Sequence, residues 1–241
     1  GAVGAALAVA NEEGSDARVA ARQAQQGIAE FPLGQHLQAL AALATHASRF
    51  PNGVLREERL TLRALALCDR GDVAIVQDGT CTETGAISLA QAGVVVRAAT
   101  AGQVTIEGSA TEAVFEVSAS NIRVEGFVIR SPRQGVKVSP PVGQTVSGLV
   151  FRSLTIVPQA TSMTLNAVDV RSATDVTIEN CTVRGSLQQG ILAKSVSRAY
   201  LRNNLVVGTG DWGIHLDNGD SASVSTGNLV TFNTVYGCGN G

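Results

Sequence analysis

The spacing of apolar residues changes once along the chain. Within 15–48 the apolar residues recur at the spacing of an α-helix, and Leu37, Leu40 and Leu43 fall on one helical face. A further helix is predicted at 56–68, just before the turn "DRG". We therefore expect a helical N-terminal segment ahead of a region of different character.

From Gly71 onward the pattern alternates between apolar and polar residues. Short runs such as "VAIV", "VVVRA", "IRVEGFVIR", "VTIENCTVR" and "LVTFNTVY" follow one another, separated by Ser, Asn, Gly and Thr. Alternation with a period of two is typical of β-strands, and the separating residues are typical of tight turns. The region therefore consists of many short strands, as in a β-sandwich or a coiled array.

An internal repeat decides between these two folds. One apolar slot recurs at spacings of 27, 27, 23 and 29 residues, and a second slot follows three positions later. The first slot holds Val124, Phe151, Ile178, Leu201 and Val230, and the second holds Phe127, Leu154, Cys181, Asn204 and Asn233. A sandwich does not explain this recurrence, whereas each rung of a parallel β-helix stacks on the one before it.

The second slot predicts the roles of its polar members. Stacked Asn204 and Asn233 are expected to form an amide ladder that satisfies buried turn groups. Cys181 continues the same column, so it is interpreted as a core residue; the alternative is a nucleophile. The glycosylation sequon that begins at Asn180 is interpreted as a strand bend.

We divide the chain into a helical N-terminal segment at 1–55 and a parallel β-helix at 56–241. The predicted helix at 56–68 would cap the first coil, because the end of a parallel stack exposes strand edges. The run "GAVGAALAVA" at 1–10 is either a remnant of a secretory signal or part of an Ala-rich helix. The last residues, "VYGCGNG", resemble the turn of a repeat, which predicts a fragment truncated at the C-terminus.

Composition restricts the partners. The chain has 241 residues and a formal net charge of -2, which does not suggest nucleic acid. No run reaches the roughly 18 apolar residues of a membrane span, so no membrane partner is expected. The four cysteines have no metal-site spacing; Cys68 and Cys81 form either a disulfide, which would fit secretion, or two free thiols.

The segment from residue 55 to residue 108 resembles the N-terminal part of proteins in the pectate-lyase-like superfamily. These proteins have a short helix, then a Gly-Asp pair, a Gly-Thr-aromatic-x-Glu motif and an apolar strand. The matching residues are Gly71, Asp72, Gly79, Thr80 and Glu83, while Cys81 stands where the family has an aromatic residue. The resemblance implies an all-β, right-handed parallel β-helix, and it is specific for the fold rather than for an activity.

Candidate chemistry lies on the short runs that open each coil, "VKV", "VDV", "ILA" and "IHL". If their apolar residues point inward, the alternate residues form outward columns. One column contains Lys137, Asp169, Leu192 and His215, and the next contains Ser139, Arg171, Lys194 and Asp217. Neighbouring coils would bring these side chains within roughly 5–10 Å of each other.

This face is suited to an acidic polysaccharide. A uronate must have its carboxylate neutralised before the adjacent C–H proton is lost, and Arg171, Lys194 or a bound cation could neutralise it. The candidates for the base that removes the proton are Lys194, Arg171 and His215. Lys137 and Trp212 are candidate substrate-binding residues. Asp169 and Asp217 are candidate ligands for a calcium ion, the one cofactor that the pattern suggests. The alternative is that all of these residues are ordinary surface polar groups and ion pairs.

Two functions follow from the two interpretations. The first is a secreted bacterial protein that acts on an acidic polysaccharide, as a lyase or, less favourably, a glycoside hydrolase. A hydrolase needs two carboxylates about 5–9 Å apart. Asp169 and Asp217 are expected two coils apart, which is roughly 10 Å, so hydrolysis is slightly disfavoured. The second is a non-catalytic surface scaffold or carbohydrate-binding protein, favoured by Leu192 within the active column. Either protein is expected to be an extracellular or cell-surface monomer.

Overall fold

The computed structural model describes residues 73–219 and 225–239, and the chain divides into two compact units, Gly1–Val76 and Gln77–Gly241. In the first unit the described residues form strand β1 (Val73–Val76). The predicted helices, the signal remnant at 1–10, the boundary between 55 and 56, and Cys68 all lie outside the described residues. Within the part of the chain that is described, no helix is long and apolar enough to cross a membrane.

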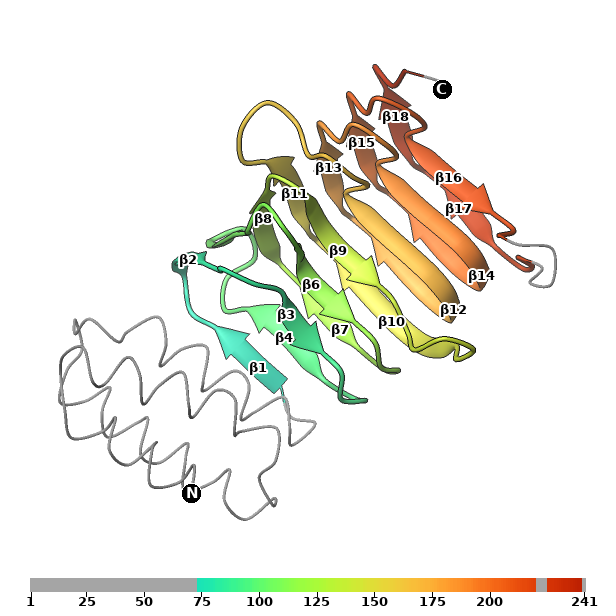
Figure 1. Ribbon diagram of the computed structural model, residues 1–241, viewed down its shortest axis with the longest axis horizontal. Helices are drawn as coiled ribbons and strands as arrows, with labels where there is room; N and C mark the ends of the chain where they lie inside the picture. The colour runs from blue at the N-terminus through green and yellow to red at the C-terminus, as the bar shows by residue number, and fades with distance from the viewer. Residues whose placement is uncertain (1–72, 220–224, 240–241) are drawn as a thin grey trace, which may run out of the picture. The chain divides into compact units, whose positions relative to one another are not determined.

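The second unit is a parallel β-helix, as the repeat predicts. Its described strands run parallel to their neighbours and stack in three faces around a common core (Figure 1). We name each face after one of its strands. The β9 face contains β3 (Ile87–Leu89), β6 (Ala113–Val117), β9 (Gln134–Val138), the first parts of β12 (Val168–Glu179) and β14 (Ile191–Arg202), and β16 (Ile214–Asp217).

The other two faces complete each coil. The β10 face contains β4 (Val95–Ala98), β7 (Arg123–Glu125), β10 (Val146–Arg152), the second parts of β12 and β14, and β17 (Leu229–Thr231). The β11 face contains β2 (Gly79–Thr82), β5 (Val104–Glu107), β8 (Phe127–Ser131), β11 (Thr155–Pro158), β13 (Thr182–Arg184), β15 (Leu205–Val207) and β18 (Thr234–Tyr236). β12 and β14 are long because each bends from the β9 face onto the β10 face without interruption.

The strand register confirms the repeat read from the sequence. On the β10 face, Phe151 pairs with Val124 on one side and Ile178 on the other, and Leu201 continues to Val230. The members from Val124 to Leu201 are fully buried, as expected for an inward column. The apolar slot is therefore one continuous strip of the core.

The corner between the β10 and β11 faces is built from residues with left-handed backbone. The φ angles there are 81° at Gly126, 53° at Ser153, 55° at Asn180, 52° at Asn203 and 55° at Phe232. Gly and Asn enter this region most readily, so the bend predicted at Asn180 is confirmed. Phe232 is the exception, because a bulky side chain is costly in this conformation.

Glycines also mark the start of strands on the β9 face. A Cβ atom on Gly190 would lie 2.4 Å from Val206, and one on Gly213 would lie 2.2 Å from Val235. Neither residue has a positive φ, so the requirement is close approach of the β11-face side chains rather than backbone freedom. Glycine at these positions leaves room for the side chains of Val206 and Val235.

The asparagine ladder of the second slot is present. Asn204 donates to the carbonyl of Ile178 at 2.9 Å and to Oδ1 of Asn233 at 2.9 Å, and its own Oδ1 accepts from the backbone N–H of Cys181 at 3.0 Å. Asn204 is buried, so these bonds replace water at turn groups that β-strand pairing leaves unsatisfied. Cys181 is likewise buried in this column, which confirms it as a core residue.

We predict that Asn204→Ala lowers the free energy of unfolding by about 2–4 kcal/mol, because it leaves two buried backbone groups unpaired. Chemical denaturation measures this loss. The matched control is Asn203→Gly in the same coil: Asn203 makes an exposed bond to Asn180, and glycine accepts its positive φ, so a loss below about 1 kcal/mol is expected. Equal losses in the two variants would show that the ladder does not stabilise the stack.

Candidate functional site

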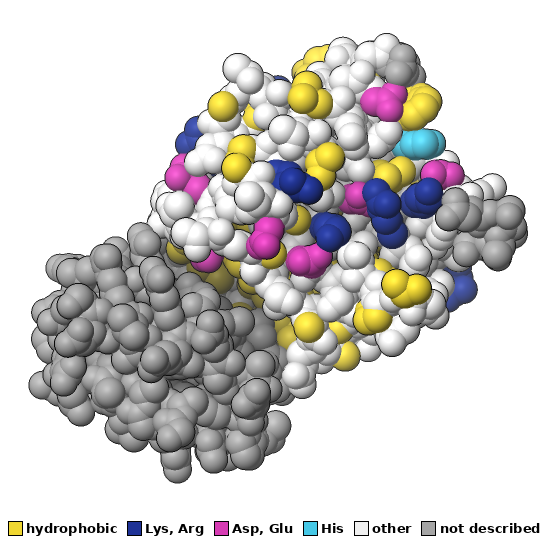
Figure 2. Space-filling view, viewed as in Figure 1, with side chains coloured by type: hydrophobic (Ala, Val, Ile, Leu, Met, Phe, Trp, Pro, Cys, Tyr) yellow, Lys and Arg dark blue, Asp and Glu magenta, His cyan; other side chains and the backbone are white. Residues whose placement is uncertain are grey.

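The structure assembles the predicted columns on the outside of the β9 face. Strand register places Lys137 next to Asp169, Asp169 next to Leu192, and Leu192 next to His215. In the adjacent column, Arg171 lies next to Lys194, which lies next to Asp217. Basic and acidic side chains are interspersed over β9, β12 and β14, and the histidine that is described lies near the C-terminal end of the row (Figure 2).

Arg171 and Asp169 form a bidentate ion pair within β12. Nε of Arg171 donates to Oδ1 of Asp169 at 2.8 Å, and the second donor reaches Oδ2 at 2.9 Å. The hydrogen bonds that Arg171 donates to this nearly buried carboxylate raise the pKa of Arg171 against the opposing effect of partial burial. Arg171 is thus held protonated, which suits it to neutralising a carboxylate rather than to accepting a proton.

The two lysines differ in how firmly they are paired. Nζ of Lys137 donates to Oε1 of Glu116 at 2.7 Å. Nζ of Lys194 lies 3.8 Å from Oδ2 of Asp217, whose other oxygen accepts from the N–H of Gly219 at 2.9 Å. Lys194 is therefore the cation of this face whose ammonium is least committed to a protein carboxylate.

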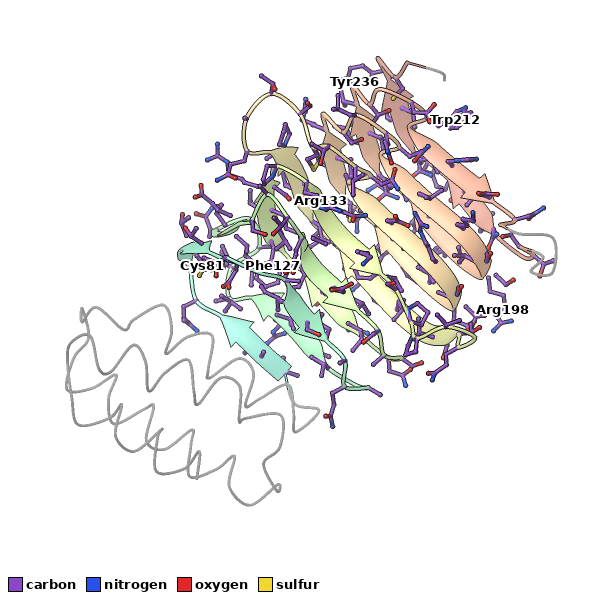
Figure 3. The ribbon with its side chains drawn as sticks, viewed as in Figure 1. Cys81, Phe127, Arg133, Arg198, Trp212 and Tyr236 are labelled. Carbon is purple, nitrogen blue, oxygen red and sulfur yellow. The ribbon has the colours of Figure 1, made fainter. Side chains whose placement is uncertain are left out.

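Trp212 and His215 pack together at the start of β16. Their ring centroids are 4.5 Å apart with an interplanar angle of 40°. Trp212 is 41% exposed and lies at the outer edge of the last coil (Figure 3). Nδ1 of His215 is buried and has no hydrogen-bond partner among the described residues. The exposed indole, held in place by the imidazole, is a suitable contact for a sugar ring.

Sequence reasoning missed the polar residues in the turns that lead into these strands. Nδ2 of Asn166 donates to Asp169 at 3.1 Å, and its Oδ1 accepts from the N–H of Gln189 at 3.0 Å. The side chain of Gln189 in turn donates to Asp211 at 2.7 Å. This chain connects successive coils beside the face and helps to orient Asp169. Its signal in the sequence is a polar residue two or three positions before β12, β14 and β16.

The two candidate calcium ligands are not neighbours in the structure. Asp169 lies on β12 and Asp217 on β16, with β14 between them, and each contacts a cation of its own. Among residues 73–219 and 225–239, no three Asp, Glu, His or Cys side chains are grouped so as to hold a metal ion. A calcium site made by Asp169 and Asp217 stays a prediction.

Sequence reasoning also missed a column of charges on the β10 face. Its register runs from Arg97 to Glu125, Arg152, Glu179 and Arg202, so opposite charges alternate from coil to coil. Each of these residues follows a member of an inward column by one position, so the pattern was present in the printed repeat. Glu179 is the best-paired member: Nε of Arg152 and Nε of Arg202 each donate to it at 2.5 Å.

Comparisons with known proteins agree with this architecture. The chain matches the model of the family described as "Right handed beta helix region" over residues 85–241. The chain belongs to this family. The match confirms the right-handed parallel β-helix expected from the sequence, and no curated protein matches the chain.

Solved structures that resemble the chain include a protein of a Geobacillus virus and two tailspike proteins. Geobacillus virus E2 ORF18 shares 15% identity at a TM-score of 0.50, over 69% of this chain and 34% of that one. The enzymatically active domain of bacteriophage CBA120 tailspike protein 2 shares 14% (TM-score 0.42, 66% and 29%), and the Dettilon tailspike protein shares 12% (TM-score 0.36, 73% and 46%). The chain spans about a third of the ORF18 protein, and likeness at this identity shows the fold alone.

We predict that Cys181 does not react with iodoacetamide in the folded protein at pH 8. Burial raises the pKa of the Cys181 thiol to about 12, so it stays neutral and out of contact with the reagent. Cys238 is partly exposed and serves as the internal control, and mass spectrometry of digested protein reads both sites. Modification of Cys181 as fast as Cys238 in native protein would support the nucleophile interpretation instead.

We also predict that Glu179→Gln lowers the free energy of unfolding by about 1–3 kcal/mol at neutral pH. Burial opposes ionisation of Glu179, but hydrogen bonds from Arg202 and Arg152 outweigh it and lower its pKa. The stability that this carboxylate contributes is present above its ordinary pKa and is lost as pH falls through the lowered one. Denaturation at a series of pH values should therefore show the gap to wild type closing in acid.

Glu116→Gln is the matched control for this measurement. Its carboxylate accepts from one cation, Lys137, and is 39% exposed, so a change below about 1 kcal/mol is expected. A gap between wild type and Glu179→Gln that does not close in acid would contradict the assignment.

Proposed function

We propose that this protein is an extracellular polysaccharide-binding β-helix whose ligand lies along the β9 face. The observation that carries the proposal is that Lys137, Arg171 and Lys194 lie on one face, in two neighbouring columns, and that the column of Lys137 ends at His215, which packs against Trp212. A row of charged donors with an aromatic surface at one end suits a polymer of sugars, since rings stack on indole and cations bind carboxylates.

The ligand that we favour is an acidic polysaccharide. Each cation of the face contacts a protein carboxylate, so a uronate would exchange places with that partner. This exchange is easiest at Lys194, which is 3.8 Å from Asp217, and hardest at Arg171, which holds Asp169 with two hydrogen bonds. We therefore place a uronate carboxylate near Lys194 and another sugar ring of the same polymer against Trp212.

A second candidate function is β-elimination at the same place. It is favoured by the loosely paired ammonium of Lys194, which lies next to Arg171, a guanidinium that is held protonated. In this reaction a base takes the proton next to the uronate carboxylate, and the bond to the leaving sugar oxygen breaks to give an unsaturated ring. His215 or Lys194 would be the base and Arg171 would neutralise the carboxylate.

Binding without catalysis is the function that the geometry supports better. Leu192 is 6% exposed and separates Asp169 from His215, so the polar groups of the face do not converge on one point. Hydrolysis is supported least, because Asp169 is nearly buried and fully engaged by Arg171 and Asn166. A retaining or inverting hydrolase needs two accessible carboxyl groups.

The test is to incubate the protein with polygalacturonate, alginate and chondroitin, with and without calcium, while measuring binding and the ultraviolet absorbance of unsaturated product. We expect binding to at least one acidic polymer, weakened about tenfold by Trp212→Ala or Lys194→Ala. Tyr236→Ala and Arg184→Ala on the β11 face are the matched controls and should bind as wild type does.

The outcomes separate the candidates. Absorbance that appears with wild type and disappears in His215→Ala would establish β-elimination. Binding without absorbance would establish a binding protein. If no acidic polymer binds, or if the β9-face variants and the β11-face controls lose affinity equally, the proposal is wrong.

A further inference from the structure

On the β10 face, arginine side chains are exposed to solvent while the carboxylate between two of them is buried. In its alternating column the side chains of Arg152 and Arg202 are 43% and 46% exposed, whereas that of Glu179 between them is 1% exposed. The carboxylate thus lies beneath the two guanidinium groups and holds them in place. On the β9 face, by contrast, Lys137 and Glu116 are about equally exposed, at 41% and 39%.

Further cationic and aromatic groups extend this surface. Arg123 on β7 is 47% exposed and lies 3.6 Å from Glu125, so it is only loosely paired. Arg198 projects outward from β14 (Figure 3). It donates two hydrogen bonds of 2.7 Å to the carboxylate of Asp175. The guanidinium of Arg202 lies 5.1 Å from the centroid of the Tyr200 ring, which fixes both groups.

We propose that the β10 face is a second ligand-binding surface, which takes a linear polysaccharide bearing carboxylates. Each guanidinium has five N–H donors in a planar fork, and Glu179 uses only part of those of Arg152 and Arg202. The remaining donors are held in a fixed orientation, so little side-chain entropy is lost when a carboxylate binds. This surface is separate from the β9 face and does not depend on the function proposed there.

The spacing of the arginines suits a repeating anion. Because the column alternates in sign, its arginines occur on every second coil, roughly 10 Å apart at the spacing of stacked strands. A polymer that runs along the stack would meet Arg152 and then Arg202 at this interval. A small free anion would gain only one such contact, so affinity should increase with chain length.

A polysaccharide is favoured over nucleic acid by the charge of the rest of the molecule. The chain carries a net charge of -2 and a pI of about 5.9, whereas nucleic-acid-binding domains are usually strongly basic. Single-stranded nucleic acid also needs a series of exposed aromatic side chains for its bases, whereas on the described strands of this face Phe151 is buried and Tyr200 is the aromatic residue that points outward.

The experiment compares Arg123→Gln with Arg130→Gln. Arg130 lies on the β11 face, is 46% exposed and is 3.7 Å from Glu107, so the two variants remove equal charge from similar, loosely paired sites. Neither arginine supports a buried carboxylate of the kind at Glu179, and thermal unfolding of both proteins verifies that they are folded. The probes are polygalacturonate fragments of increasing length, dextran as a neutral polymer, and single-stranded oligonucleotide.

We expect Arg123→Gln to weaken polygalacturonate binding about three- to tenfold and to reduce its dependence on salt, with Arg130→Gln close to wild type. A folded Tyr200→Ala variant should weaken it as well. Equal binding by the Arg123→Gln and Arg130→Gln variants, or tighter binding of oligonucleotide than of polygalacturonate, would overturn the inference. Loss of binding in Trp212→Ala alone would overturn it while leaving the function proposed for the β9 face intact.

Discussion

Hydrogen bonding between equivalent strands of successive coils is the interaction on which the rest of this structure depends. It holds Phe151 in register with both Val124 and Ile178. It also aligns Arg171 on β12 with Lys194 on β14 on the outside of the coil. Because parallel pairing fixes neighbours about 4.8 Å apart, each residue of a coil meets the residue at the same place in the next coil. Columns, rather than isolated contacts, are therefore the units of both core and surface.

Stacking in columns makes charge placement a constraint on the fold. Like charges placed one above another repel, so the outer columns alternate in sign or turn their charges sideways. The β10 face uses alternation, with Glu179 between Arg152 and Arg202. The β9 face turns Arg171 toward Asp169 within one strand, which separates it from Lys194 in the next coil. The first arrangement leaves a cationic surface, and the second leaves a balanced one.

The right-handed β-helix family explains the architecture of the chain without explaining its ligand. Geobacillus virus E2 ORF18 shares only 15% identity with the chain, so the likeness shows the fold alone. Inward positions are restricted by packing, because Gly190 and Gly213 must admit the side chains of the next face. Outward positions carry no such restriction, which is why the function has to be argued from the side chains of the two polar faces.

The sequence by itself determined the coil. Its slots identified the buried column from Val124 to Leu201 and the ladder of Asn204 and Asn233, because a period of two separates inside from outside and a repeat aligns the coils. It also placed Lys194 and His215 on one face. Only the tertiary structure decided that Arg171 is held by Asp169 and that Glu179 lies beneath two arginines. Such pairings depend on the rotamer of each side chain, and the periodicity of the sequence does not determine rotamers.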